Sequence, residues 1–200
     1  FIDGFKKLVE QNNQPTINRL IKFMADSVQG ELISKCLYND RNYAEYTRYI
    51  VYSLVLNLSF EEFHECSIKF NVEETPIISC IWNYTRMFDS LEYIGKCNKN
   101  PFDGDAHSGN INACLINPLG LVIVDNGNHS VNNEGEIIAN VTVDISPVLE
   151  KYKFNGKDYV DIITNEKINN NFLKNNSEPF IYTLGLFFEM ARVLKERQDR

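Results

Sequence analysis

Side chains that carry oxygen gather near the middle of the chain. Asp105 and Asn110 lie five residues apart in a polar, glycine-containing segment, and two apolar runs follow at residues 111–116 and 121–124. The residues between the runs, Asn-Pro-Leu-Gly, are typical of a turn, so the pattern predicts a β-hairpin. Such a hairpin would return the next residue, Asp125, to the side of Asn110. Carboxylate and amide oxygens of this kind suit a Mg²⁺ site.

Few groups are needed for phosphoryl transfer, because positioning and charge neutralisation supply most of the catalysis. One carboxylate must orient the attacking group, an amide oxygen must bind metal, and a second carboxylate must join the metal to the phosphates. Asp105, Asn110 and Asp125 can fill these roles in that order. The same spacing, Asp-x4-Asn followed by a hairpin and a second Asp, marks the catalytic centre of protein kinases.

The segment FDGDAHSGNI at residues 102–111 resembles the catalytic loop of aminoglycoside-phosphotransferase-like and other atypical kinases. It also resembles the D-x-H-x-x-N loop of phosphatidylinositol 3/4-kinases and HipA-like kinases, and VIVDNG at residues 122–127 is similar to their metal-binding segment. The resemblance implies an ATP- and Mg²⁺-dependent phosphotransferase that acts on a hydroxyl of an unidentified protein, lipid or small molecule. The roles it implies are catalysis for Asp105 and His107, Mg²⁺ binding for Asn110 and Asp125, and nucleotide binding for Asn110, Asp125 and Gly127.

The elements around these residues are expected to be helices. We expect a mainly α fold with a small β-hairpin, like a kinase C-terminal lobe, formed by residues 1–200 as a single catalytic lobe. Residues 1–96 are expected to be helical, residues 97–130 to hold the loop, hairpin and metal-binding segment, and residues 131–200 to form a loop and helices. The expected helices are 17–28 with Thr16 as cap, 43–58, 60–70, 76–94, 146–153, 157–173 and 178–197, and residues 130–143 are expected to be an irregular loop.

The sequence departs from these kinases in two places. Asp103 stands where they often carry His, and neither a glycine-rich loop nor a strand lysine is visible. The N-terminal lobe of a kinase is therefore expected to be absent, to lie in a missing segment, or to come from a partner chain that completes the nucleotide site.

Composition narrows the class of protein. With 200 residues and 44% hydrophobic content, the chain can bury a sizeable core. A formal charge of -7 argues against nucleic-acid binding, which needs a concentrated basic surface. Five Cys without a CxxC pair favour a reducing, intracellular compartment, the cytoplasm, and no apolar run is long enough for a transmembrane segment. Cys114 falls within a predicted strand and is expected to be inert packing.

Two other functions fit the same residues. A catalytically inactive pseudokinase or interaction module would keep the fold without turnover. A metal-dependent phosphoesterase would use Asp105-Ala106-His107 and Gly127-Asn128-His129 as ligands for two metals that activate water. That enzyme would need an apolar strand running directly into Asp105, whereas residues 96–101 are polar. Asp, Asn and Gly are also common turn residues without any catalytic role.

Overall fold

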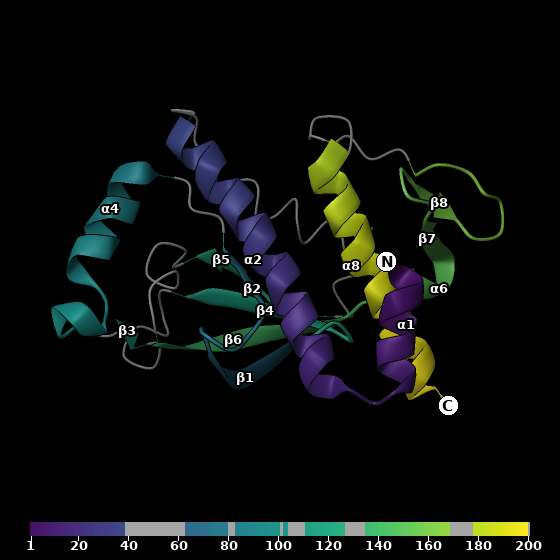
Figure 1. The fold of residues 1–200 in the computed structure, drawn as a ribbon, viewed down its shortest axis with the longest axis horizontal. Helices are drawn as coiled ribbons and strands as arrows, with labels where there is room; N and C mark the ends of the chain where they lie inside the picture. Colours follow the sequence, from purple (N-terminus) through teal and green to yellow (C-terminus); the bar gives the residue numbers. More distant parts are fainter. Residues whose placement is uncertain are drawn as a thin grey trace.

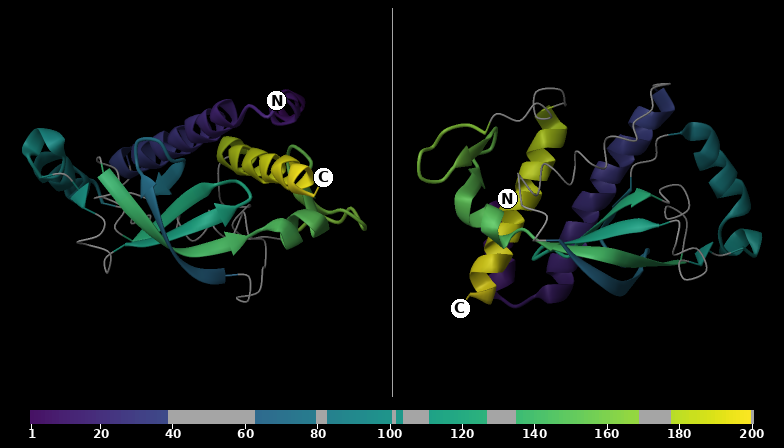
Figure 2. Two further views of the ribbon diagram at one scale, coloured as in Figure 1. Left: turned by 90° about the horizontal axis from the view of Figure 1, so that it is seen from below. Right: turned by 180° about the vertical axis from the view of Figure 1, so that it is seen from behind.

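The centre of the molecule is a six-stranded mixed β-sheet (Figure 1). The computed structural model describes residues 1–38, 63–79, 83–100, 102–103, 111–126, 135–168 and 178–199. The expectation of a mainly helical fold with a small hairpin, like a kinase C-terminal lobe, is wrong, because the sheet organises most of the described chain. Helices cover one face of this sheet (Figure 2).

The strand order in the sheet is β1-β6-β4-β5-β2, and β3 pairs with β6. The pairs β1–β6 and β4–β5 are antiparallel, whereas β2–β5, β3–β6 and β4–β6 are parallel. A separate two-stranded ribbon joins β7 and β8. The strands are β1 (Phe63–Asn71), β2 (Ile77–Ser79), β3 (Phe102–Asp103), β4 (Asn112–Asn117), β5 (Leu121–Asn126), β6 (Gly135–Asp144), β7 (Tyr152–Phe154) and β8 (Tyr159–Asp161).

Three helices, α1 (Ile2–Glu10), α2 (Gln14–Tyr38) and α8 (Glu178–Gln198), lie over one face of the sheet (Figure 2). Their apolar residues recur at three and four spacing and therefore form one buried stripe on each helix. Sheet residues such as Ile78, Leu121 and Ile123 join them in the main core. The expected inner faces of α2 and α8 are confirmed except at Leu20, which is only partly buried. The buried residues of these faces are Ile17, Ile21, Met24, Val28, Phe180, Leu184, Phe187, Phe188, Ala191 and Leu194.

The opposite face of the sheet forms a second, smaller core that includes Ile77, Val122, Val124 and Ile137. Strand β5 is therefore buried on both faces, which explains its unbroken apolar run. Helix α6 (Ser146–Lys151) adds Val148 and Leu149 to the main core, whereas α4 (Tyr84–Tyr93) and the 3₁₀ turn η2 (Lys96–Asn98) lie outside both cores.

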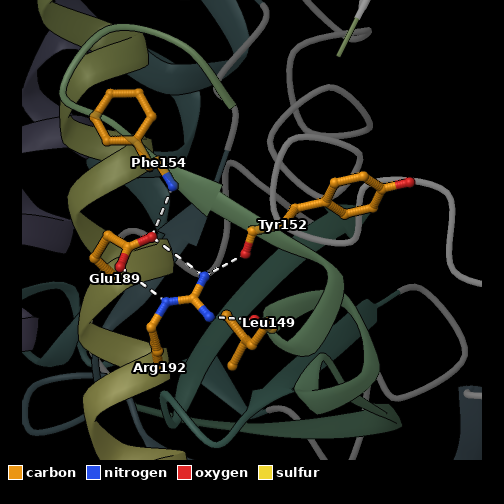
Figure 3. A network of polar contacts seen from close by, with 5 residues as sticks. All are labelled: Leu149, Tyr152, Phe154, Glu189 and Arg192. Carbon is orange, nitrogen blue, oxygen red and sulfur yellow. Dashed lines mark hydrogen bonds and ion pairs between the residues drawn. The ribbon is translucent and has the colours of Figure 1, made fainter. Parts of the chain in front are cut away.

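A polar network ties α8 to α6 and to the start of β7 (Figure 3). The Arg192 guanidinium donates to the backbone carbonyls of Leu149 and Tyr152, and it pairs with Glu189 at 2.9 Å. Glu189 in turn accepts the backbone N–H of Phe154 at 2.7 Å. Because these partly buried groups satisfy one another, the network fixes the start of β7 against the helix.

The expected helix at residues 60–70 is wrong, because residues 63–71 form β1. Its register against β6 is irregular between Glu65 and Ile68, as in a β-bulge. The bulge places the half-buried residues Phe63, Cys66 and Phe70 at three and four spacing. A strand with a bulge thus imitates the apolar period of a helix.

Other expected helices are also corrected. The 76–94 helix is split into β2 and α4, because the Asn83 side chain accepts the Arg86 N–H at 2.9 Å and starts a new helix there. The 157–173 segment is not helical over its described part, where β8 ends in a turn at Asp161. Residues 130–143 are expected to be a loop, but 135–143 belong to strand β6. The expected 43–58 helix lies outside the described residues.

The hairpin and the helices at 17–28 and 178–197 are confirmed. Helix α2 begins at Gln14, so Thr16 lies inside it and is not its cap. The helix expected at 146–153 ends at Lys151, because β7 begins at Tyr152.

Candidate functional site

Asp125 stands near the end of β5, at one edge of the sheet. The four residues before it, Leu121–Val124, are each no more than 1% exposed, whereas Asp125 is exposed. Because β2 runs parallel to β5, the carboxyl ends of both strands meet at this edge. Ligands of open sheets with parallel strands commonly bind beyond the carboxyl ends of the strands. We call this the Asp125 edge.

Asp125 is the extra residue of a β-bulge. On β4, the adjacent residues Asn112 and Ala113 oppose Asn126 and Val124, so Asp125 is the residue by which β5 exceeds β4 in this register. A bulge re-aims the side chain at an edge and is common beside active sites. The carboxylate is therefore placed at the strand end by backbone geometry.

Two asparagine side chains fasten the start of β4 at this edge. The Asn140 side chain, from β6, accepts the backbone N–H of Ala113 at 3.0 Å and donates to the Asn112 Oδ1 at 3.3 Å. The regular pairing of β4 with β6 begins only at Cys114. Asn140 thus extends the contact between the two strands to the residues opposite Asp125.

Helix α2 reaches the same edge through Gln29. The Gln29 Oε1 accepts the backbone N–H of Ser79 at 2.7 Å, and Ser79, beside Val124, is only 1% exposed. The Gln29 Nε2 is buried, and no hydrogen-bond partner is found for it in the described part of the chain. The edge strand β2 is therefore covered by a polar side chain rather than left open.

The whole chain, residues 1–200, matches the family described as "Family of unknown function (DUF6710)". The chain belongs to the DUF6710 family. No curated protein matches the chain. No solved structure matches it either. Membership of DUF6710 brings no assigned reaction, so the chemistry has to be argued from the residues at the Asp125 edge.

Of the site residues predicted from this DUF6710 sequence, only Asp125 is described. Asp105, His107, Asn110 and Gly127 lie outside the described residues. The flanking residues are described: Asp103 pairs with Glu136 in the sheet, and Asn112 lies opposite Asn126. The pairing of Asn112 with Asn126 therefore places Asn112 at the edge that carries Asp125. The predicted hairpin is confirmed. Its predicted return of Asp125 to the side of Asn110 stays a prediction, because Asn110 lies outside the described residues.

The described residues of this DUF6710 chain offer one candidate metal ligand at this edge, the Asp125 carboxylate. Among them, no group of three or more His, Cys, Asp and Glu side chains could hold a metal ion. Mg²⁺ needs fewer protein ligands, since it is usually held by one or two carboxylates together with water and phosphate oxygens. An exposed carboxylate at a strand end fits that requirement for one ligand.

Some residues at this edge were missed by sequence reasoning. Asn112 and Asn140 were assigned no role, and residues 130–143 were expected to be a loop. The signal that could have found them is the alternation of Ala139, Val141 and Val143 with Asn140, Thr142 and Asp144, which is typical of a strand. No helix in the described ranges is both long and apolar enough to cross a membrane.

Proposed function

We propose that this chain is a divalent-metal-dependent enzyme that acts on phosphoryl groups, with Asp125 as its principal metal ligand. The observation that carries the proposal is the β-bulge, which presents an exposed carboxylate at the end of a strand that is otherwise buried on both faces. Burying a strand up to the residue before a carboxylate gives that carboxylate a fixed backbone position. A metal bound there would neutralise charge on a phosphate.

The first form of the proposal is transfer of the γ-phosphoryl group of Mg-ATP to a hydroxyl acceptor. Asp105 would orient the acceptor, His107 would assist proton movement, and Asn110 would be a second metal ligand. Gly127 would lie in the nucleotide-binding segment. The order of these residues around the confirmed hairpin supports this form. The acceptor is a protein, a lipid or a small molecule, and a partner chain or further segment would complete the nucleotide site.

The second form is hydrolysis of a phosphoester, and one observation favours it. Residues 102–103, which precede the Asp105-Ala106-His107 segment, form the strand β3 rather than a polar loop. Strand β5 likewise leads into the Gly127-Asn128-His129 segment. Metallophosphoesterases commonly place such ligands after strands, and metal-activated water would then attack the phosphorus atom.

The test compares the wild-type protein with Asp125→Ala and Asp125→Asn. Isothermal titration calorimetry measures Mg-ATP binding, and two assays follow phosphoryl chemistry: loss of the γ-phosphate of ATP with Mg²⁺, and hydrolysis of bis-p-nitrophenyl phosphate with Mn²⁺ and no ATP. We expect both substitutions to lower metal-dependent binding or turnover by about 100-fold or more. The matched control is Asp144→Asn, at the end of β6, because the amide oxygen retains the bond that Asp144 accepts from the Ser146 N–H.

Each outcome assigns the protein to one of the alternatives. ATP-dependent transfer supports the phosphotransferase, whereas Mn²⁺-dependent hydrolysis without ATP supports the phosphoesterase. Mg-ATP binding without turnover, unchanged by Asp105→Asn, supports an inactive binding module. Equal nucleotide affinity and equal turnover in the wild type and in Asp125→Ala, at matched metal concentration, would contradict the proposal.

A further inference from the structure

A cavity of about 350 Å³ lies at the end of the β4–β5 hairpin away from Asp125. It is lined by the first turns of α2, the last turns of α8 and the turn between β4 and β5, and it is open to solvent on one side. Figure 1 shows the start of α2 and the end of α8 at the same end of the molecule. The cavity is large enough for a small organic molecule. It is therefore separate from the Asp125 edge and independent of the function proposed for that edge.

The floor of the cavity is apolar and its rim is polar. Ile21, Leu119 and Leu194 line the floor and are buried. The rim carries the amide side chains of Gln14, Asn18 and Gln198 together with the Arg197 guanidinium. A cavity with an apolar floor and a polar rim fits a ligand that has an apolar body and one polar head.

Arg197 is the cation of this rim. Its Nη1 donates to the Gln14 Oε1 at 3.3 Å, and the Gln14 Nε2 donates to the Asn18 Oδ1 at 2.8 Å. Within the described residues no carboxylate pairs with Arg197, although the formal charge of the chain is -7. By contrast Lys195, two residues earlier, pairs with Glu150 at 3.0 Å and with Asp199 at 2.9 Å. A half-buried guanidinium without a counter-ion favours an anionic ligand.

The lining also limits the charge of that ligand. Among the described residues that line the cavity, Arg197 is the one cationic side chain, whereas a phosphate or sulfate dianion is usually held by several cations or by backbone N–H groups. A planar carboxylate matches the guanidinium fork and carries a single charge. The amides of Asn18 and Gln198 can add neutral hydrogen bonds.

We propose that this cavity binds a small monocarboxylate with an apolar body, its carboxylate at Arg197 and its body over Leu119 and Leu194. The basic position in the last turn of α8 would also suit the helix dipole without any ligand. The two roles predict different results, because a residue that only favours the dipole affects stability and not ligand affinity.

The test uses hexanoate as the probe on the full chain, with binding followed by two-dimensional ¹H–¹⁵N NMR titration and by calorimetry. We expect saturable shifts at the cavity residues, and little binding of hexanamide, which keeps the apolar body without the charge. Arg197→Gln should weaken hexanoate binding by about tenfold or more. Arg19→Gln, at an exposed position next to Asn18 on α2 but outside the lining, is the matched control and should bind as the wild type does.

A variant that blocks the cavity distinguishes binding inside the cavity from a general effect of the Arg197 charge. Asn18 is exposed, so Asn18→Trp should fold normally while its indole fills the mouth of the cavity and abolishes hexanoate binding. The inference is overturned if hexanoate does not bind, if Arg197→Gln binds it as well as the wild type, or if inorganic phosphate or hexanamide binds equally tightly. None of these results depends on Asp125, so the proposed phosphoryl chemistry is tested separately.

Discussion

Asp125 illustrates how much of the site a single position can reveal. Four apolar residues followed by Asp-Asn-Gly predict a buried strand that ends at a carboxylate, and the structure confirms this part. The bulge that gives Asp125 its place could not be predicted, because it depends on the register between Asn112 and Asn126. The register is set by the pairing of whole strands, so it cannot be read from the type of any single residue.

Asn140 is expected to support the Asp125 edge specifically. Asn140→Ala removes the bonds to Ala113 and Asn112 and should lower the free energy of unfolding by about 1–2 kcal/mol, measured by urea denaturation. It should also shift the backbone amide resonance of Asp125 in ¹H–¹⁵N spectra. The loss follows because the start of β4 is no longer held to β6.

The matched control for Asn140 lies at the other end of the same strand pair. The Asn117 Nδ2 donates to the Thr142 Oγ1 at 2.9 Å, beside the β4–β5 turn. Asn117→Ala should cost a similar free energy of unfolding, of about 1 kcal/mol, and should leave the Asp125 resonance in place. Equal shifts at Asp125 in the two variants would show that Asn140 has no special relation to that edge.

The cysteines should differ widely in reactivity. Burial, with a smaller contribution from Cys66, raises the pKa of the Cys114 thiol to about 12, whereas Cys97 is exposed. A raised pKa keeps Cys114 protonated, so only about 10⁻⁴ of it is thiolate near pH 8. Iodoacetamide labelling followed by peptide mass mapping should therefore modify Cys97 long before Cys114. In denaturing urea the two should react at similar rates, and equal rates in the native protein would contradict the burial of Cys114.

At the scale of elements, the helices with a regular apolar stripe could be predicted from the sequence, whereas strands β1 and β6 could not. The stripe of α8 recurs at three and four spacing over its whole length, which only a helix satisfies. In β1 the bulge between Glu65 and Ile68 breaks the alternation expected of a strand and produces helical spacing. Local pattern therefore fails where the backbone itself is irregular.

Two glycines inside long helices should respond in opposite ways to alanine. A Cβ at Gly185 on α8 would lie 2.4 Å from the Phe154 ring, whereas a Cβ at Gly30 on α2 meets nothing within 4 Å. Gly185→Ala should lower the free energy of unfolding by about 1–3 kcal/mol through overpacking. Gly30→Ala should raise it by roughly 0.5–1 kcal/mol, because alanine loses less backbone entropy in a helix.

Chemical denaturation followed by circular dichroism measures both alanine variants. Gly185→Ala and Gly30→Ala serve as controls for each other, since the chemical change is the same and only the surroundings differ. Phe154 is held by Tyr159, with ring centroids 5.2 Å apart, so its ring has little room to move aside. If Gly185→Ala proved as stable as the wild type, the close packing of α8 against β7 would be wrong.

At the scale of the whole molecule, the kinase C-terminal lobe failed as a prediction because the sheet joins distant segments. Strand β1 pairs with β6 through partners such as Phe63 and Val143, which are far apart in sequence. Neither strand can bury its apolar face alone, so the pairing is decided by tertiary packing. The chemistry suggested by Asp105, Asn110 and Asp125 does not require a kinase lobe, since it needs only that the oxygen atoms converge.

The same architecture predicts that stability is unevenly distributed. Strand β5 is buried on both faces, whereas α4 has Met87 as its buried residue and leaves Phe88, Leu91 and Tyr93 more than half exposed. Met87 packs with Ile33 of α2 in a small cluster apart from the two main cores. Helix α4 can therefore open without disturbing the sheet.

Native-state hydrogen exchange measured by NMR tests this division. Amides of β5 should exchange only through global unfolding, and amides within α4 should exchange at least about 100-fold faster through local opening. Met87→Ala should accelerate exchange in α4 and leave β5 unchanged, because the contact with Ile33 is lost while both main cores remain. Equal protection of α4 and β5 would mean that the helix folds and unfolds with the sheet as one cooperative unit, and faster exchange in β5 after Met87→Ala would contradict the separation of the clusters.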